Sequence, residues 1–227
     1  MKVDVDTEIE LCKCPHILIG GCTGSGKTYL MRHMIEDVLN GSEGDIRLVV
    51  VDPKNVDYQY LRNDERWLYQ GIDLIDRDGI DSGYCNQVLG WLCEEMAERY
   101  RIMKSEGIYN WGDLGRERIL LLVDELTDLI YYDRDKSRGV MRGSIERSLV
   151  RLSMLGRAAG LHLMLGTQRP DAQTLPGQLR ANIGCRICLR VSTETERRIV
   201  LGQSGKGYGE RSMEYLSNIY SLKYELD

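Results

Sequence analysis

Residues 16–30 read HILIGGCTGSGKTYL, and this stretch decides the fold. An apolar run over His16–Ile19 leads directly into a glycine-rich segment of the pattern GxxxxGK[ST], and a helical pattern follows from Thr28 to about Leu39. Glycines let such a loop curl until its backbone N–H groups face an anion, and the next helix offers its free N–H groups to the same anion. The stretch therefore predicts a strand, a phosphate-binding loop and a helix, in this order.

The glycine-rich loop assigns roles to its residues. Lys27 would reach the β- and γ-phosphates of a nucleotide, and the Thr28 hydroxyl would ligate Mg²⁺. We expect the Lys27 side chain to face solvent when no nucleotide is bound. A glycine-rich turn with a surface lysine is the alternative, but it does not explain the flanking strand and helix. ATP and Mg²⁺ are the expected cofactors, and the loop residues expected to bind them are Gly21, Cys22, Thr23, Gly24, Ser25, Gly26, Lys27 and Thr28.

Short apolar runs alternate with helical patterns along the rest of the chain. This alternation predicts an α/β fold with a mostly parallel central sheet and helices on both faces. Residues 133–143 read as a charged loop whose arginines and lysine either bind phosphates or are simply solvated, and the last 25 residues give poor signals. Further strands are predicted at 47–51, 119–123, 161–166 and 183–191, and further helices at 81–104, 144–160 and 193–201.

Two carboxylates end the predicted strand at 119–123. The run LLLVDE, residues 120–125, places Asp124 and Glu125 at the carboxyl end of a buried strand, which is the edge where α/β sheets bind ligands. Asp124 is expected to hold Mg²⁺, the Walker B role, and Glu125 to orient and deprotonate the attacking water. A strand that merely ends in a polar turn is the alternative, and a preceding phosphate loop makes it the weaker one.

A polar segment, TQRP at 167–170, follows the next predicted strand. A polar residue at this place lies beside the γ-phosphate in RecA-like sheets. Gln168 is therefore expected to sense whether that phosphate is present.

The composition limits the function. Apolar residues make up 42% of the 227-residue chain and charged residues 29%, which is ordinary for a globular domain. No run approaches the roughly 18 apolar residues that a membrane span needs, so a cytoplasmic location is expected, with any membrane anchor in segments absent from this sequence. A formal charge of −5 argues against a general nucleic-acid binder, although it permits a local basic surface. His16 and His162 lie in strand-like runs and are expected to be hydrogen-bonded core residues.

The ordered motifs resemble those of the FtsK/SpoIIIE family from about Lys13 to Gly209. A phosphate loop alone is common to many families, whereas this ordered set is specific. The most specific part is GRAAGLHL at 156–163 followed by TQRP. The other motifs are KCPH at 13–16, VDPK at 51–54, ERYRIM at 98–103 and DELTDL at 124–129.

The resemblance implies a RecA-like motor domain that forms a hexameric ring with ATP between subunits. Arg157 matches the family's arginine finger, which acts in a neighbour's site; a helix-terminal arginine that complements the dipole is the alternative. Arg169 and Arg198 match family positions on loops that contact DNA phosphates. The family's pore-loop lysine is replaced here by Glu194, with Arg197 as a possible substitute. Residues 15–227 are expected to form this motor domain, with 1–14 as the remnant of an upstream segment.

Three functions follow from this resemblance. The first is an ATP-driven double-stranded DNA translocase that works as a homo-oligomeric ring. The alternative is a protein-export motor like those of type VII secretion, whose phosphate loops or Walker B carboxylates are often degraded. The third is a non-hydrolysing nucleotide-binding scaffold, which the intact set of Lys27, Asp124 and Glu125 disfavours. Segregation, conjugation, packaging and plasmid replication all remain open as the process served.

Overall fold

The computed structural model describes residues 10–11, 13–41, 46–52, 54, 56–61, 63–66, 75–76, 79–80, 82–131 and 139–202. A five-stranded parallel sheet forms the centre of this part of the chain, with strand order β2-β5-β6-β1-β7. A separate antiparallel pair joins β3 and β4. The strands are β1 (His16–Gly20), β2 (Ile46–Val51), β3 (Ile75–Asp76), β4 (Gly79–Ile80), β5 (Arg118–Val123), β6 (Leu161–Thr167) and β7 (Cys185–Cys188).

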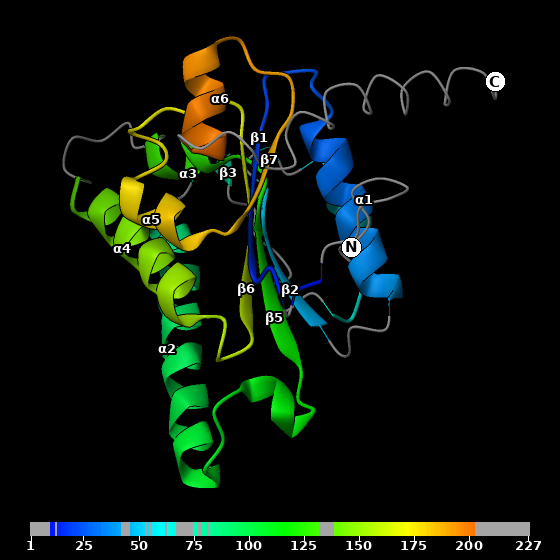
Figure 1. The fold of residues 1–227 in the computed structure, drawn as a ribbon, viewed down its shortest axis with the longest axis vertical. Helices are drawn as coiled ribbons and strands as arrows, with labels where there is room; N and C mark the ends of the chain where they lie inside the picture. Colours follow the sequence, from blue (N-terminus) through cyan, green and yellow to red (C-terminus); the bar gives the residue numbers. More distant parts are fainter. Residues whose placement is uncertain are drawn as a thin grey trace.

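Helices cover both faces of the sheet, as predicted. Figure 1 shows α1 alone on one side of the strands and α2, α4 and α5 together on the other. The α-helices are α1 (Lys27–Asn40), α2 (Ser82–Glu106), α3 (Leu126–Tyr131), α4 (Gly139–Leu155), α5 (Gly177–Asn182) and α6 (Glu194–Leu201). Two 3₁₀ turns, η1 (Gln59–Leu61) and η2 (Trp111–Leu114), complete the described elements. None of the described helices is both long and apolar enough to cross a bilayer.

Each central strand contributes to two hydrophobic cores. In β5, Leu120 and Leu122 belong to the core beneath α1, whereas Ile119, Leu121 and Val123 belong to the core beneath α2 and α4. Side chains alternate between the faces of a strand, so a strand covered on both sides must be apolar throughout. The apolar run that predicted this strand is therefore explained by the two helical layers.

The helix predicted at 144–160 has different ends in the structure. It begins at Gly139, inside the segment predicted as a loop, and stops at Leu155. Gly156 and Gly160 then form a turn in which the Leu161 amide donates to the Gly156 carbonyl at 2.9 Å, and Gly160 has a φ of 70°. Gly160 thus takes a left-handed conformation that favours glycine and ends the helical path. The remainder of that predicted loop, 132–138, lies outside the described residues, as do 1–9 and 203–227.

Two short α-helices escaped the sequence prediction, as did β3, β4 and both 3₁₀ turns, and one predicted strand is shorter than expected. Helices α3 and α5 have six residues each, too few to show a helical period. Strand β7 covers only Cys185–Cys188 of the predicted 183–191.

The strand order explains how distant motifs meet. Because β5, β6 and β1 are parallel neighbours, their carboxyl ends lie at one edge of the sheet. The segments that follow these strands hold Asp124 and Glu125, Gln168, and the phosphate loop respectively. This edge is the place where α/β sheets bind ligands.

Candidate functional site

The phosphate loop bends through two glycines in the left-handed region. Gly24 has a φ of 73°, and Gly26, which caps the amino end of α1, has a φ of 87°. Gly21 also needs its missing side chain, because a Cβ there would lie 2.4 Å from the Ser25 Oγ. The Cys22 amide donates to the Arg190 carbonyl at 2.8 Å, which ties the loop to the segment after β7. The loop is thus held in a curled form at the start of α1, as an anion-binding loop requires.

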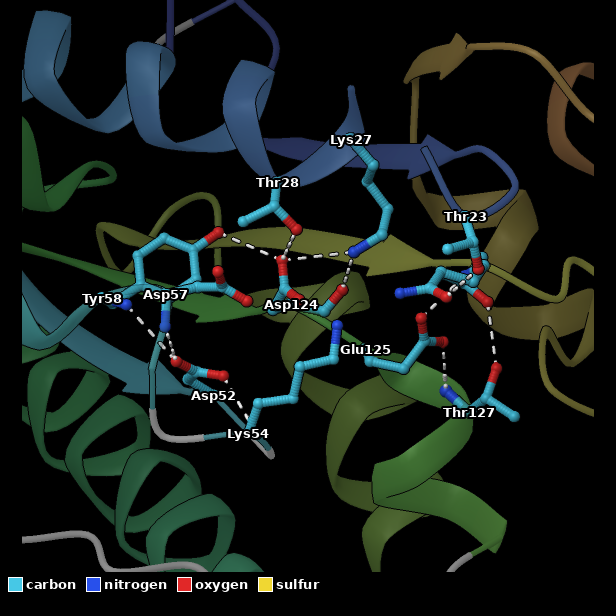
Figure 2. A network of polar contacts seen from close by, with 12 residues as sticks. Thr23, Lys27, Thr28, Asp52, Lys54, Asp57, Tyr58, Asp124, Glu125 and Thr127 are labelled. Atoms are coloured by element: carbon cyan, nitrogen blue, oxygen red, sulfur yellow. Dashed lines mark hydrogen bonds and ion pairs between the residues drawn. The ribbon is translucent and has the colours of Figure 1, made fainter. Parts of the chain in front are cut away.

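Lys27 does not face solvent, and the expectation that it would was wrong. Only 3% of the residue is exposed, because its ammonium forms an ion pair with the Asp124 carboxylate at 3.2 Å and also donates to the Asp124 backbone carbonyl. Figure 2 shows the side chain reaching down from α1 to the end of β5. A phosphate must therefore compete with Asp124 for this ammonium.

Asp124 is fully buried at the centre of the polar network. Its Oδ1 atom accepts hydrogen bonds from the Thr28 hydroxyl at 3.1 Å and the Tyr58 hydroxyl at 3.2 Å (Figure 2). Its Oδ2 atom is buried with no partner among the described residues. Thr28 and Asp124, the predicted magnesium ligands, therefore lie together, and the buried oxygen without a partner fits a hard cation.

Glu125 is held by two backbone amides. Oε1 accepts from the Thr127 amide at 3.1 Å and Oε2 from the Gln168 amide at 2.8 Å, so the carboxylate lies between the ends of β5 and β6. Burial raises the pKa of this carboxyl, and it outweighs the hydrogen bonds and the Lys27 charge that lower it. A fixed carboxylate with a raised pKa can accept a proton from water more readily than an exposed one.

Gln168 contacts the phosphate loop directly. Its side-chain oxygen accepts a hydrogen bond from the Thr23 hydroxyl at 2.9 Å. Behind it, the hydroxyls of Thr127 and Thr167 lie 3.1 Å apart and join the ends of β5 and β6. The structure therefore brings Gln168, Glu125 and the loop together at one edge, while the predicted sensing role stays a prediction.

Several residues of this edge carry no sequence signal that would have revealed them. Tyr58 is buried and reaches Asp124 from a loop after β2, and burial together with the Asp124 charge raises the pKa of its hydroxyl. The hydroxyl thus stays protonated and donates. Thr127 and Thr167 flank predicted site residues, but a threonine beside a strand end is too common to be singled out.

Arg157 lies away from this edge. It is exposed in the turn between α4 and β6, next to the amino end of β6, whereas the phosphate loop follows the carboxyl end of the parallel strand β1. The structure therefore does not bring Arg157 to the chain's own phosphate loop.

The two histidines are buried at the amino ends of their strands. His162 Nδ1 lies 3.2 Å from the Pro15 carbonyl, as expected for a hydrogen-bonded core residue. His16 has no described partner at either ring nitrogen, so the expectation of a hydrogen bond was wrong for it. Burial, followed by the nearby Arg157 charge, lowers the pKa of His16 to about 4; burial and the charges nearby lower that of His162 to about 3.

The predicted DNA-contacting arginines lie in different settings. Arg169 is exposed directly after Gln168. Arg198 lies in helix α6 rather than on a loop, and its guanidinium is 3.2 Å from the Glu194 carboxylate. Arg197 binds the same carboxylate through two hydrogen bonds of 2.7 and 2.6 Å, and these arginines lower the pKa of Glu194 to about 2. Glu194 therefore offsets charge that α6 would otherwise present.

Solved structures share this fold. The pCW3 conjugation coupling protein TcpA, in a monomer form with ATPγS, superposes with a TM-score of 0.70 and 29% identity, over 85% of this chain and 53% of that one. The cytoplasmic domain of the Thermomonospora curvata type VII secretion ATPase EccC gives a TM-score of 0.67 at 22% identity, over 83% of this chain and 22% of that one. The second likeness concerns the fold alone, which is that of the RecA-like P-loop ATPases in both cases.

Curated proteins are also similar to this chain in sequence. The DNA translocase FtsK of Caldanaerobacter subterraneus subsp. tengcongensis is 32% identical over 86% of this chain and 27% of its own length. The DNA translocase SpoIIIE of Bacillus subtilis is 31% identical over 86% of this chain and 25% of its own length. The chain thus spans about a quarter of the length of these relatives. Residues 1–118 and 109–172 match the profile of the FtsK/SpoIIIE family, and the chain belongs to that family.

Proposed function

We propose that this chain binds ATP with Mg²⁺ at the edge formed by the phosphate loop, Asp124 and Glu125, and that it hydrolyses the nucleotide. The position of Glu125 carries the proposal. This buried carboxylate is fixed by two amides, has a raised pKa and lies on the strand that ends in Asp124. A domain that only bound nucleotide would have no need of a second, separately held carboxylate here.

The other residues of this edge bind the nucleotide and the cation. Lys27 exchanges Asp124 for the nucleotide phosphates, and Thr28 and Asp124 hold the cation. Mg²⁺, when bound there, offsets negative charge on the phosphate oxygens. Glu125 orients a water molecule and takes its proton. Gln168 exchanges Thr23 for the γ-phosphate and passes the change to the segment that follows β6.

Hydrolysis is completed between copies of the chain. Arg157 is exposed at the opposite edge of the sheet from the phosphate loop, which supports a role in a neighbour's site rather than in its own. In a closed ring each copy would supply an arginine to the next. A hexamer is the assembly that the family resemblance favours.

Double-stranded DNA is the proposed substrate. The curated relatives are named DNA translocases, and TcpA is named a conjugation coupling protein. Arg169 and Arg198 are the proposed phosphate contacts. Because such contacts ignore base sequence, DNA binding should be sequence-independent and should weaken steeply with salt.

Hydrolysis with and without duplex DNA, measured on assembled rings, tests this proposal. Replacing Arg169 and Arg198 together by Ala should remove the stimulation by DNA and flatten the salt dependence of binding, with basal hydrolysis kept. Glu194→Gln should act in the opposite direction, because it releases Arg197 and Arg198 from their shared carboxylate. We expect it to tighten duplex binding roughly two- to fivefold at low salt.

A double Ala replacement of Arg101 and Arg147 is the matched control. Both side chains are exposed on α2 and α4, and the change in net charge is identical. This control should keep the stimulation. If verified rings hydrolyse ATP but neither bind duplex DNA nor respond to it, the DNA substrate is wrong and a polypeptide substrate becomes the next to test.

A further inference from the structure

A short loop after β2 is fastened by one carboxylate. Asp52, buried at the end of β2, accepts the Lys54 amide on Oδ1 at 3.1 Å. Its Oδ2 accepts the amides of Val56, Asp57 and Tyr58 at 3.0, 2.9 and 3.3 Å. Four amides bound to one side chain fix the backbone of this loop against the sheet. Asp52 thereby determines where the side chains of Asp57 and Tyr58 lie.

The loop fastened by Asp52 brings the carboxylate of Asp57 to the edge of the sheet that holds Asp124 and Glu125. One oxygen each of Asp52, Asp57 and Asp124 lies within 4.8 Å of the others. Figure 2 shows Asp57 and Tyr58 on one side of Asp124 and Glu125 on the other. The carboxylate of Asp57 is thus separate from the one assigned to proton transfer.

The hydrogen bonds of Asp124 indicate which kind of ligand would fit among these carboxylates. Tyr58, Thr28 and Lys27 all bind its Oδ1 atom, whereas Oδ2 is buried without a described partner. A desolvated carboxylate oxygen without a hydrogen bond is costly unless a cation contacts it. The protein donors leave free the one atom that a cation needs.

Nucleotide binding increases the need for a cation among these carboxylates. On the proposed function, which this step assumes, Lys27 leaves Asp124 for the phosphates, and the three carboxylates lose their buried ammonium. Like charges at such separations repel strongly in a partly buried site. Small divalent cations bind oxygen ligands, and carboxylates foremost.

We propose that Asp57 is a further ligand, directly or through one water molecule, of the divalent cation that Thr28 and Asp124 hold. The cation would lie between Asp124 and the loop after β2, so β2 as well as β5 would contribute to the nucleotide site. Asp52 serves this arrangement by fastening the loop, since both of its oxygens already accept amides.

Mn²⁺ binding to the whole chain tests this assignment. Free Mn²⁺ is measured by electron paramagnetic resonance during titration, with ADP and with a non-hydrolysable ATP analogue. Asp57→Asn should weaken Mn²⁺ binding about 10- to 100-fold in the presence of nucleotide. Asp57→Glu, which keeps the carboxylate, should recover most of the affinity. Asp113→Asn removes the same charge from an exposed position on η2 and should bind Mn²⁺ as the wild type does.

Nucleotide binding in EDTA separates this inference from the proposed function. It should be no weaker in Asp57→Asn than in the wild type, which also shows that the variant is folded. If Asp124→Asn loses Mn²⁺ binding and Asp57→Asn retains it, Asp57 is no ligand although the nucleotide site stands. If the wild type binds neither nucleotide in EDTA nor Mn²⁺ with it, both are overturned.

Discussion

The two edges of the sheet handle polarity in opposite ways. At the carboxyl edge, Lys27, Asp124 and Glu125 are buried and held by one another or by backbone amides. At the amino edge, His16 and His162 are buried with lowered pKa values, and the charged Arg157 lies exposed. The carboxyl edge thus buries charge where it can be paired, because unpaired charge is costly in the core. On the proposed function, the edge with the exposed charge is the one that serves a neighbouring copy.

Breaking the buried pair should have the largest effect. Lys27→Ala removes the ammonium that would bind phosphate and also leaves Asp124 buried without its counter-charge. We expect nucleotide hydrolysis to be lost. The free energy of unfolding without nucleotide should fall by about 3 kcal/mol, which lowers Tm by roughly 6–12 °C. Steady-state hydrolysis and thermal unfolding followed by circular dichroism measure the two effects.

The exposed Lys104→Ala is the control for this variant and should change neither quantity. Wild-type hydrolysis by Lys27→Ala would remove the phosphate loop from the proposed function. An unchanged Tm would show that the ion pair contributes nothing to the stability of the protein.

Variants that each impair one of the two edges should have the next largest effect. Arg157→Ala is expected to keep nucleotide binding to the isolated subunit and to slow hydrolysis in rings by about 10³-fold, because the stabilising charge is lost from the neighbour's site. Glu125→Gln should bind ATP but hydrolyse it about 10²- to 10⁴-fold more slowly. Mixed rings of the two variants should regain activity wherever an intact Arg157 meets an intact Glu125. Activity as a function of mixing ratio measures this.

Mixed rings must first be shown to form, for example by native mass spectrometry. No recovery at any ratio in such rings would place Arg157 outside the neighbour's site. Its alternative role, complementing the dipole at the end of α4, would then remain.

Acid should act first on the amino edge, and each pH unit costs less stability there than the loss of the Lys27–Asp124 ion pair. The folded protein holds His16 neutral down to a pKa of about 4, whereas the unfolded chain takes up a proton below about 6.5. Stability is therefore complete above about pH 6.5 and falls between about pH 6.5 and 4, by up to about 1.4 kcal/mol per pH unit for this residue. His162 adds the same slope down to its pKa of about 3.

Urea unfolding at several pH values measures this dependence. His16→Leu should flatten it by up to about 1.4 kcal/mol per pH unit relative to the wild type. The leucine loses no described hydrogen bond, since neither ring nitrogen has one. His33→Leu, at an exposed position of α1, is the matched control and should follow the wild type. An equal slope in His16→Leu and wild type would show that His16 does not titrate on unfolding in this range.

Much of the fold can be predicted from local sequence patterns. The apolar runs of β1, β2, β5 and β6 could be predicted because both faces of these strands are buried, which forces nearly every residue to be apolar. The end of α4 could not, since the turn at Gly156 and Gly160 depends on tertiary packing: a Cβ on Gly160 would lie 2.8 Å from the Trp111 ring. The helical pattern alone gives no reason to stop there.

The site residues likewise fall into those that the sequence could predict and those that it could not. Residues of the phosphate loop, Asp124 and Glu125 could be named because their order along the chain is itself the signal. Tyr58 and Asp57 could not, because they reach Asp124 only through the loop that Asp52 fastens. The burial of Lys27 was also missed, since its partner lies at the end of a strand that is not even a neighbour of β1.

The place of β1 within the sheet has a consequence for how the protein is made. The strand that carries the phosphate loop is synthesised before both of its hydrogen-bonding neighbours, β6 and β7. On the ribosome, β2 and β5 can pair as soon as both have emerged, whereas β1 must wait until residues 161–188 follow. Pairing over such separations is slow, and it exposes unpaired strand edges in the meantime. We expect a nascent chain released before Leu161 to be insoluble, and the nucleotide loop to be among the last parts of the protein to form.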